Sequence, residues 1–254
     1  MRRVVGLLVL VILLTTAVGI NRLTQNWHYV LPVEPGQVAY VAAFDGFTDD
    51  WSQYQGVLAA HIADGALRLE ADSANSGPFS ATRQYFGDFD LRVQASPVDG
   101  PADNGYGVIF RLQDNDNTDV SDDSYYWFLV SSDGYYQVVR VLNGQQKRLS
   151  DWIPSDAILP GLNVTNTLRV VATDSRFRFY INNQPVQLCV PDDPTGESTF
   201  TALNECVQGQ MMDELADTAI ASGRIGVIAH AFSEPGVVVQ FDNLIVLGPE
   251  ITNE

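Results

Sequence analysis

The sequence is poor in basic residues, and this shortage limits what the chain can bind. Lysine and arginine together number 14, against 31 aspartates and glutamates, so the formal net charge is −17. A phosphate backbone has to be met by Lys and Arg side chains, which argues against a nucleic-acid partner. The same balance disfavours electrostatic docking on anionic lipid. What remains is an acidic surface that keeps a globular domain soluble.

Histidine and cysteine are also scarce. The three histidines, His28, His61 and His230, lie far apart in the sequence, which disfavours a zinc site. The two cysteines, Cys189 and Cys206, form an even count that predicts a disulfide in an oxidising compartment. Two free thiols are the alternative.

The N-terminus carries the one long apolar run. Arg2 and Arg3 precede an apolar segment from Val4 to Ile20, which is typical of a signal peptide or of an uncleaved membrane anchor. The poor cleavage site at Ala17 favours an anchoring helix, with the remaining chain outside the cytoplasm by the positive-inside rule. A secreted protein is the alternative. The predicted organisation is anchor or signal 1–20, tether 21–36, domain 37–248 and tail 249–254.

Long amphipathic helices are absent, and short strands take their place. In the central stretch Gly105–Trp152, four apolar and aromatic runs are separated by turn sequences. Asp133-Gly134 and Asn143-Gly144 favour tight hairpins because glycine tolerates positive φ. Alternating segments before and after predict further strands, Val38–Phe44, Ala66–Glu70, Phe89–Ala95, Thr167–Ala172, Phe177–Ile181, Val186–Val190, Arg224–His230 and Val237–Leu247. Met211–Ala216 is predicted to form a short helix.

This pattern predicts an all-β fold, a two-sheet antiparallel jelly-roll sandwich preceded by one N-terminal apolar helix. Its motifs in order are Phe44–Phe47 with Trp51, Gly105–Arg111, Asn182-Asn183, Gly223–Val227 and Phe241–Leu244. Together they resemble concanavalin A-like lectin/glucanase domains, of the laminin-G-like and 3-keto-disaccharide-hydrolase-like bacterial kind. The resemblance implies one convex and one concave sheet, carbohydrate on the concave face, frequent calcium sites, and first and last strands side by side.

The catalytic motif of the glycanase branch is missing. That branch carries Glu-x-Asp-x-x-Glu on a strand, because a retaining mechanism needs two carboxyl groups close together. Only Glu214 and Asp217 share part of this spacing, and they lie in an irregular segment. The sequence therefore favours a protein that is not an enzyme, with a keto-disaccharide-type hydrolase kept as an alternative.

Two groups of aspartates are candidate calcium ligands, because calcium prefers oxygen donors. The first group lies in the acidic loop and consists of Asp114, Asp116, Asp119 and Asp122. The second group would form if the terminal strands pair, and it consists of Asp45 and Asp242. The loop begins like an EF-hand but lacks its glycine and its closing glutamate. A solvated hairpin loop and ordinary turn residues are the alternative interpretations.

The central aromatics are candidate sugar-binding residues. Alternation along strands predicts that Tyr126, Phe128, Val108 and Phe110 face the core. The predicted ligand-binding residues are Arg111, Tyr125, Trp127 and Tyr135, with Arg111 and Trp127 on the concave face. Aromatic packing across strands, with no ligand, is the alternative.

The sequence thus predicts an exported, membrane-tethered binding module for a glycan or another cell-envelope component. One alternative is an accessory structural subunit of a larger membrane complex, in which the partners are membrane proteins. The other is glycoside processing. Calcium is the one cofactor considered.

Overall fold

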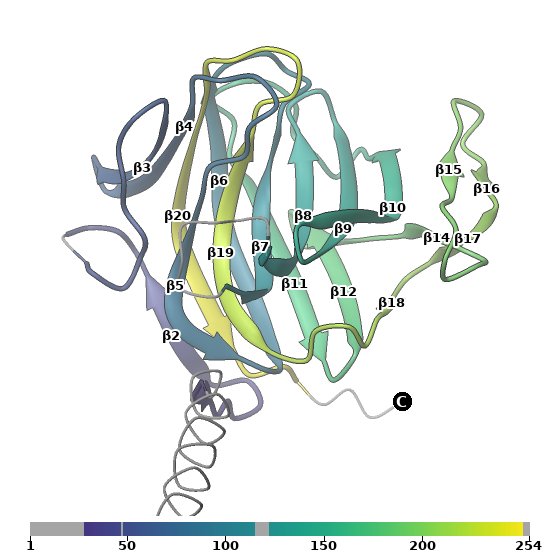
Figure 1. Ribbon diagram of the computed structural model, residues 1–254, viewed down its shortest axis with the longest axis horizontal. Helices are drawn as coiled ribbons and strands as arrows, with labels where there is room; N and C mark the ends of the chain where they lie inside the picture. Colours follow the sequence, from purple (N-terminus) through teal and green to yellow (C-terminus); the bar gives the residue numbers. More distant parts are fainter. Residues whose placement is uncertain (1–27, 47, 115–121, 251–254) are drawn as a thin grey trace, which may run out of the picture.

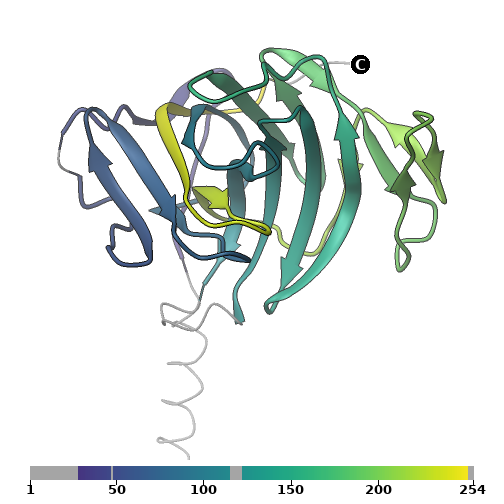
Figure 2. The same ribbon diagram turned by 90° about the horizontal axis from the view of Figure 1, so that it is seen from above.

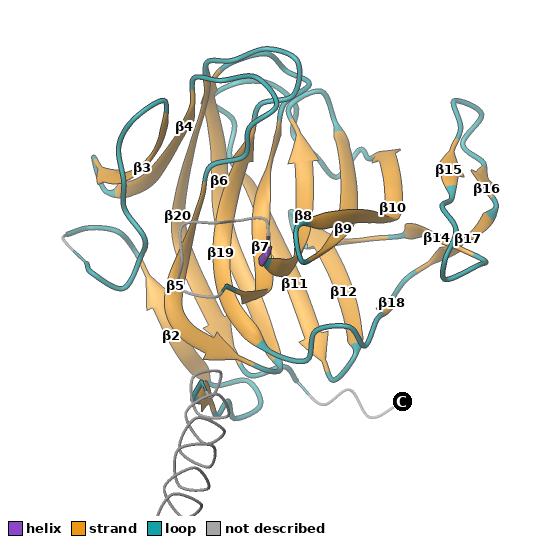
Figure 3. Cartoon of the chain, in the orientation of Figure 1, coloured by secondary structure: helices purple, strands orange, loops and turns teal. Residues whose placement is uncertain are grey.

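The computed structural model describes residues 28–46, 48–114 and 122–250, and these form strands and loops without an α-helix (Figure 3). The predicted all-β two-sheet sandwich is confirmed. The N-terminal helix in that prediction falls on residues 1–20, which lie outside the described residues, so the fold class is corrected to what the described residues form, an all-β sandwich. Within the described ranges, no helix has the length and apolar character needed to span a membrane.

One sheet has seven strands and contains the central hairpins (Figure 1). In spatial order it is built from β1 (Val30–Leu31), β5 (Phe79–Phe86), β19 (Gly223–His230), β7 (Gly105–Gln113), β8 (Ser124–Ser131), β9 (Tyr135–Leu142) and β10 (Gln145–Pro154). The predicted turns lie between β8 and β9 and between β9 and β10. Asn143 and Gly144 both have positive φ, 47° and 71°, as a tight hairpin turn requires. β1 runs parallel to β5, so the sheet is not wholly antiparallel.

The second sheet has nine strands and carries the predicted junction of the chain ends. It is built from β13 (Gln184–Val186), β12 (Arg176–Ile181), β11 (Asn166–Thr173), β6 (Phe89–Asp99), β20 (Val237–Leu247), β4 (Ala66–Ala71) and β3 (Leu58–Ala63), with β2 (Val38–Ala42) on β20 and β18 (Leu215–Ala216) on β12. Tyr40 lies opposite Val246, which confirms that the first long strand pairs with the last. The sequence prediction missed β3 and β5.

The core lies between the sheets and is rich in phenylalanine. All four residues predicted to face it are fully buried, namely Val108, Phe110, Tyr126 and Phe128. The ring of Phe128 lies 5.0 Å from that of Phe179 in the opposite sheet, measured between centroids. Period-two alternation therefore assigned these side chains to the correct face, because successive residues of a strand point to opposite sides.

A side arm, residues 188–222, follows β13; its small sheets project away from β3 and β4, and its last part returns to the sandwich, where β18 pairs with β12 (Figures 1 and 2). It contains the small sheets of β14 (Leu188–Pro191) with β17 (Gly209–Met212) and of β15 (Thr199–Phe200) with β16 (Cys206–Val207). The helix predicted over Met211–Ala216 is wrong, because this segment pairs as β17 and β18 instead. Six residues form too few hydrogen bonds to nucleate a helix against such pairing.

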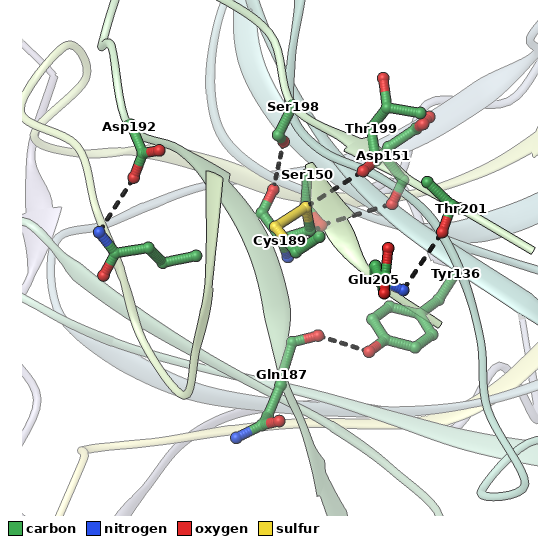
Figure 4. The surroundings of a disulfide bond; sticks show 12 residues. Tyr136, Ser150, Asp151, Gln187, Cys189, Asp192, Ser198, Thr199, Thr201 and Glu205 are labelled. Carbon is green, nitrogen blue, oxygen red and sulfur yellow. Dashed lines mark hydrogen bonds between the residues drawn. A yellow bond between two sulfur atoms is a disulfide. The ribbon is translucent and has the colours of Figure 1, made fainter. Parts of the chain in front are cut away.

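The predicted disulfide between Cys189 and Cys206 is confirmed and ties the arm's two small sheets together. Cys189 is fully buried, and its amide donates to the Ser150 hydroxyl of β10 over 3.1 Å. Its carbonyl accepts a hydrogen bond from Ser198 at 2.5 Å. Figure 4 shows Ser150 and Ser198 close to the disulfide. The arm is therefore attached to the edge of the seven-stranded sheet.

Candidate functional site

The outer face of the seven-stranded sheet, which points away from the sandwich core, is apolar. Its members alternate with core residues along five neighbouring strands, β5, β19, β7, β8 and β9. They are Ala81, Ile109, Leu112, Trp127, Leu129, Val139 and Ile228, with Phe79, Tyr125 and Trp152 packed against them. The outer face of an antiparallel sheet is usually polar where it meets water. An apolar outer face instead marks a surface that other groups cover or that binds a ligand.

Aromatic rings form a continuous row across this face, and we call it the ring row. It joins β5, β8, β19 and β10, and neighbouring centroids lie 4.5 to 6.3 Å apart along Phe79, Tyr125, Trp127, His230, Phe232 and Trp152. Such separations are those of favourable ring pairs. Except for Trp127, which is 4% exposed, the rings are only half-buried. Trp127 is therefore the most deeply buried ring of the row, and the other five rings are more exposed to solvent.

Two glycines beside the ring row, one at the start of β7 and one in the loop before β5, occupy positions where a side chain would interfere. A Cβ placed on Gly105 would lie 3.2 Å from the ring of Phe232. A Cβ on Gly77 would lie 3.0 Å from the imidazole of His230. The absence of side chains at these two positions lets Phe232 and His230 pack closely over the sheet.

Two polar atoms of the ring row have no protein partner. Both the indole Nε1 of Trp127 and the Nδ1 of His230 are buried without a hydrogen bond to any described residue. Buried polar groups are normally satisfied, so each such exception calls for a water or a ligand. Burial lowers the pKa of His230, which keeps its imidazole neutral near pH 7. The row thus offers one N–H donor and one neutral imidazole to a bound hydroxyl group.

The structure brings two of the predicted ligand-binding residues together and separates a third. Tyr125 and Trp127 share the outer face, with ring centroids 6.0 Å apart. Burial, with a smaller contribution from Asp123, raises the pKa of the Tyr125 hydroxyl to about 12. Tyr135 is 41% exposed but lies at the opposite end of the β8–β9 hairpin from Tyr125, so it does not join the ring row.

The placement predicted for Arg111, beside Trp127 on the concave face, is wrong. Phe110 lies opposite Tyr126, but Gln113 lies opposite Ser124, so β7 carries one extra residue at a β-bulge. Arg111 has a φ of 53° in this bulge and is 1% exposed. The prediction assumes that side chains alternate between the two faces of the sheet along an unbroken register. One inserted residue moves a side chain to the other face of the sheet.

Arg111 instead joins three segments inside the sandwich. Its guanidinium donates to the carbonyl of Ile220 over 2.8 Å and also to the carbonyls of Gly87 and Asp174. It lies 4.8 Å from the ring centre of Phe177. Burial lowers the pKa of Arg111. Its surroundings are those of a structural residue.

The candidate calcium ligands do not form a metal site among the described residues. Asp114 forms an ion pair with Arg224, while Asp116 and Asp119 lie outside the described residues. Asp242 accepts a hydrogen bond from the neighbouring Asn243 amide at 2.6 Å. In the described ranges, no three His, Cys, Asp or Glu side chains converge, whether around Asp45 or Asp122 or elsewhere.

Sequence reasoning missed His230, Phe232 and Trp152 as members of the site. The signal that could have found His230 was its position on a predicted strand, since alternation from the buried Ala229 places it on the outer face. Phe232 follows that strand in a loop, and Trp152 lies in β10 at the second of two register shifts, between Ser150 and Ile153. Their approach to the sheet depends on loop paths that no local pattern records.

The fold and this face define a class of protein: two-sheet jelly-roll sandwiches with an aromatic outer sheet face. The chain belongs to the family of 3-keto-alpha-glucoside-1,2-lyase-like domains, whose profile matches residues 39–246. The resemblance to concanavalin A-like domains is thereby confirmed. No curated protein matches the chain significantly.

Similar solved structures come from several kinds of protein. A β-glucanase of Bacillus licheniformis superposes with a TM-score of 0.54 at 10% identity, over 84% of this chain and 99% of its own. A Bacillus subtilis protein with a galectin-like fold gives 0.53 at 12% identity, over 85% and 98%. The Crh5 transglycosylase gives 0.51 at 12% identity, over 87% and 89%. At such identities the likeness shows the fold alone.

Proposed function

We propose that this protein is a carbohydrate-binding module that holds a neutral glycan on the ring row without cleaving it. The observation that carries this proposal is the buried indole N–H of Trp127, which has no acceptor among the described residues and lies within a row of half-exposed rings. Binding sites of this kind combine an apolar, aromatic lining with a few directed polar groups. Family membership and the aromatic face support the same ligand class.

The chemistry of the ring row suits a sugar better than a charged ligand. The apolar faces of sugar rings can lie on the half-buried rings of Tyr125, Trp152 and Phe232. A hydroxyl oxygen can accept the Trp127 N–H, and a hydroxyl hydrogen can be donated to the neutral His230 Nδ1. The formal charge of −17 favours a neutral glycan over a polyanion.

A glycan array tests this proposal with the wild-type chain and two matched variants. Trp152→Ala removes a half-buried ring from the row and is expected to lower affinity about five- to tenfold, since a stacked aromatic ring contributes about 1–1.5 kcal/mol. Tyr135→Ala, which removes an exposed ring outside the row, is expected to bind as the wild type does. If no neutral glycan binds the wild type, or if the two variants lose binding equally, this site is wrong.

We also propose that the domain is exported and held at the outer side of the cell membrane by the apolar segment Val4–Ile20. The disulfide between Cys189 and Cys206 supports an oxidising compartment. Fractionation with a protease-protection assay tests it: membrane-bound protein should be digested from outside. Protein found in the medium would favour the secreted alternative. A stable assembly with membrane proteins after mild detergent extraction would favour an accessory subunit.

Glycoside processing is the second candidate, favoured by His230 and by the family. A 1,2-elimination on a 3-keto sugar removes the C2 proton next to the carbonyl, forms a C1–C2 double bond and breaks the C1–O glycosidic bond, and the departing oxygen takes up a proton to leave as an alcohol. A neutral imidazole is suited to accept the C2 proton. His230 is neutral near pH 7 and belongs to the ring row. Turnover of a 3-keto-glucoside by the wild type but not by His230→Asn would favour this candidate over simple binding.

A further inference from the structure

An open pocket of about 370 Å³ lies where the arm meets the sandwich. Its walls come from β9, β10 and the arm and include Arg140, Lys147, Leu149, Val190, Pro191 and Asp217. Arg140 lies opposite the buried Tyr126, so the pocket opens on the inner side of β9 and β10. Trp127 points to the other side of the sheet, and the pocket is therefore separate from the ring row.

Two cations lie side by side on the wall of this pocket. Arg140 of β9 and Lys147 of β10 are direct partners in the strand register. Like charges directly opposite on neighbouring strands destabilise a sheet, and the chain has only 14 basic residues to place. This costly arrangement in an acidic protein indicates a site for an anion, because a bridging anion would offset the repulsion.

The carboxylates of the protein neutralise only part of the positive charge of Arg140 and Lys147. Arg140 Nη1 lies 2.5 Å from Asp217 Oδ2. Lys147 donates to the carbonyl of Pro194, and no carboxylate among the described residues lies within ion-pair distance of it. Asp193 is exposed, and its pKa is lowered mainly by hydrogen bonds from Thr195 and to a smaller extent by the charge of Lys147. Asp193 and Lys147 do not form an ion pair.

Asp217 is held in place and cannot turn toward Lys147. Its Oδ1 accepts the Tyr126 hydroxyl at 2.7 Å and the Ala219 amide at 2.8 Å, while Oδ2 accepts Arg140. These bonds also fix the guanidinium of Arg140, whose side chain stays 22% exposed. The pocket thus presents one fixed guanidinium and one ammonium group at the end of an apolar wall.

We propose that this pocket binds a uronic acid residue, with its carboxylate between Arg140 and Lys147 and its ring against Leu149, Val190 and Pro191. Charged donors form the stronger hydrogen bonds to a carboxylate. An apolar wall beside them suits the C–H face of a sugar ring more than a bare inorganic anion. The proposal stands independently of glycan binding on the ring row.

Calorimetric titration of the full chain tests the proposal, with glucuronate as the ligand, glucose as its neutral counterpart and acetate as the bare carboxylate. Glucuronate is expected to bind saturably, at least about tenfold more tightly than either control, because only it combines charge and ring. Raising the salt concentration should weaken its binding. Equal affinity for glucose, or for acetate, would overturn the assignment.

Two variants locate the site. Lys147→Met removes the ammonium group while keeping the length of the side chain, and it is expected to weaken glucuronate binding about tenfold. Arg148→Met removes one positive charge from the next residue, which pairs with Glu197 outside the pocket, and should leave affinity unchanged. Equal losses in both variants would refute the pocket. Trp127→Phe should leave glucuronate binding intact, which separates failure here from failure at the ring row. Thermal melts confirm folding of each variant.

Discussion

Replacing Arg111 with methionine is expected to destabilise the fold without a direct effect on glycan binding. Methionine fills much of the same space but removes the donors to the carbonyls of Ile220, Gly87 and Asp174. Each buried acceptor left without a donor costs about 1–3 kcal/mol. Water can reach some of these groups, so we expect a total loss of about 3–5 kcal/mol in the free energy of unfolding.

Urea denaturation followed by tryptophan fluorescence measures this loss. Arg148→Met is a matched control, because that side chain is 47% exposed and its surface ion pairs contribute about 1 kcal/mol or less. Arg111→Lys should fall between the two, since an ammonium group keeps the charge but cannot reach three carbonyls in the same geometry. A variant Arg111→Met as stable as the wild type, yet unable to bind a glycan, would refute the buried placement and restore Arg111 to the ligand site.

Three further predictions concern other parts of the fold. Replacing Cys189 and Cys206 together with serine opens a short loop and should reduce stability by about 3 kcal/mol in urea denaturation, and an unchanged midpoint would contradict a stabilising role of the disulfide. Burial raises the pKa of Asp90, but hydrogen bonds from two arginine side chains outweigh it, so the net pKa is lowered. Ionised Asp90 therefore stabilises the fold fully above the pKa of the unfolded chain, near 4, and this stabilisation is lost as the pH falls through the pKa of the folded state. In melts from pH 2 to 7, the melting temperature of Asp90→Asn should fall less at acid pH than that of the wild type. A Cβ on Gly223 would lie 2.2 Å from the backbone of Arg111, so Gly223→Ala should lower the melting temperature by several degrees. An unchanged melting temperature would show that the β-bulge shifts to make room for the methyl group.

The candidate site was only partly predictable from sequence, and Arg111 and Trp127 show why. Both were assigned to one face from alternation along their strands. Trp127 lies in an unbroken register between β8 and β9, so its side chain points away from the core side of the sheet, opposite to Tyr126 and Phe128, as alternation predicts. Arg111 lies at a bulge, and a bulge is set by how β7 fits both of its neighbours rather than by its own residues.

The sequence alone determined the all-β sandwich, its central hairpins, its buried alternating residues and its disulfide. Each depends on local information: turn chemistry at Asn143-Gly144, period two along β8, and an even pair of cysteines. Tertiary structure alone decided that the arm forms strands, that Phe232 packs between His230 and Trp152, and that Arg140 lies opposite Lys147. These features arise from contacts between distant segments, whose energies exceed local preferences and leave no periodic trace in the chain.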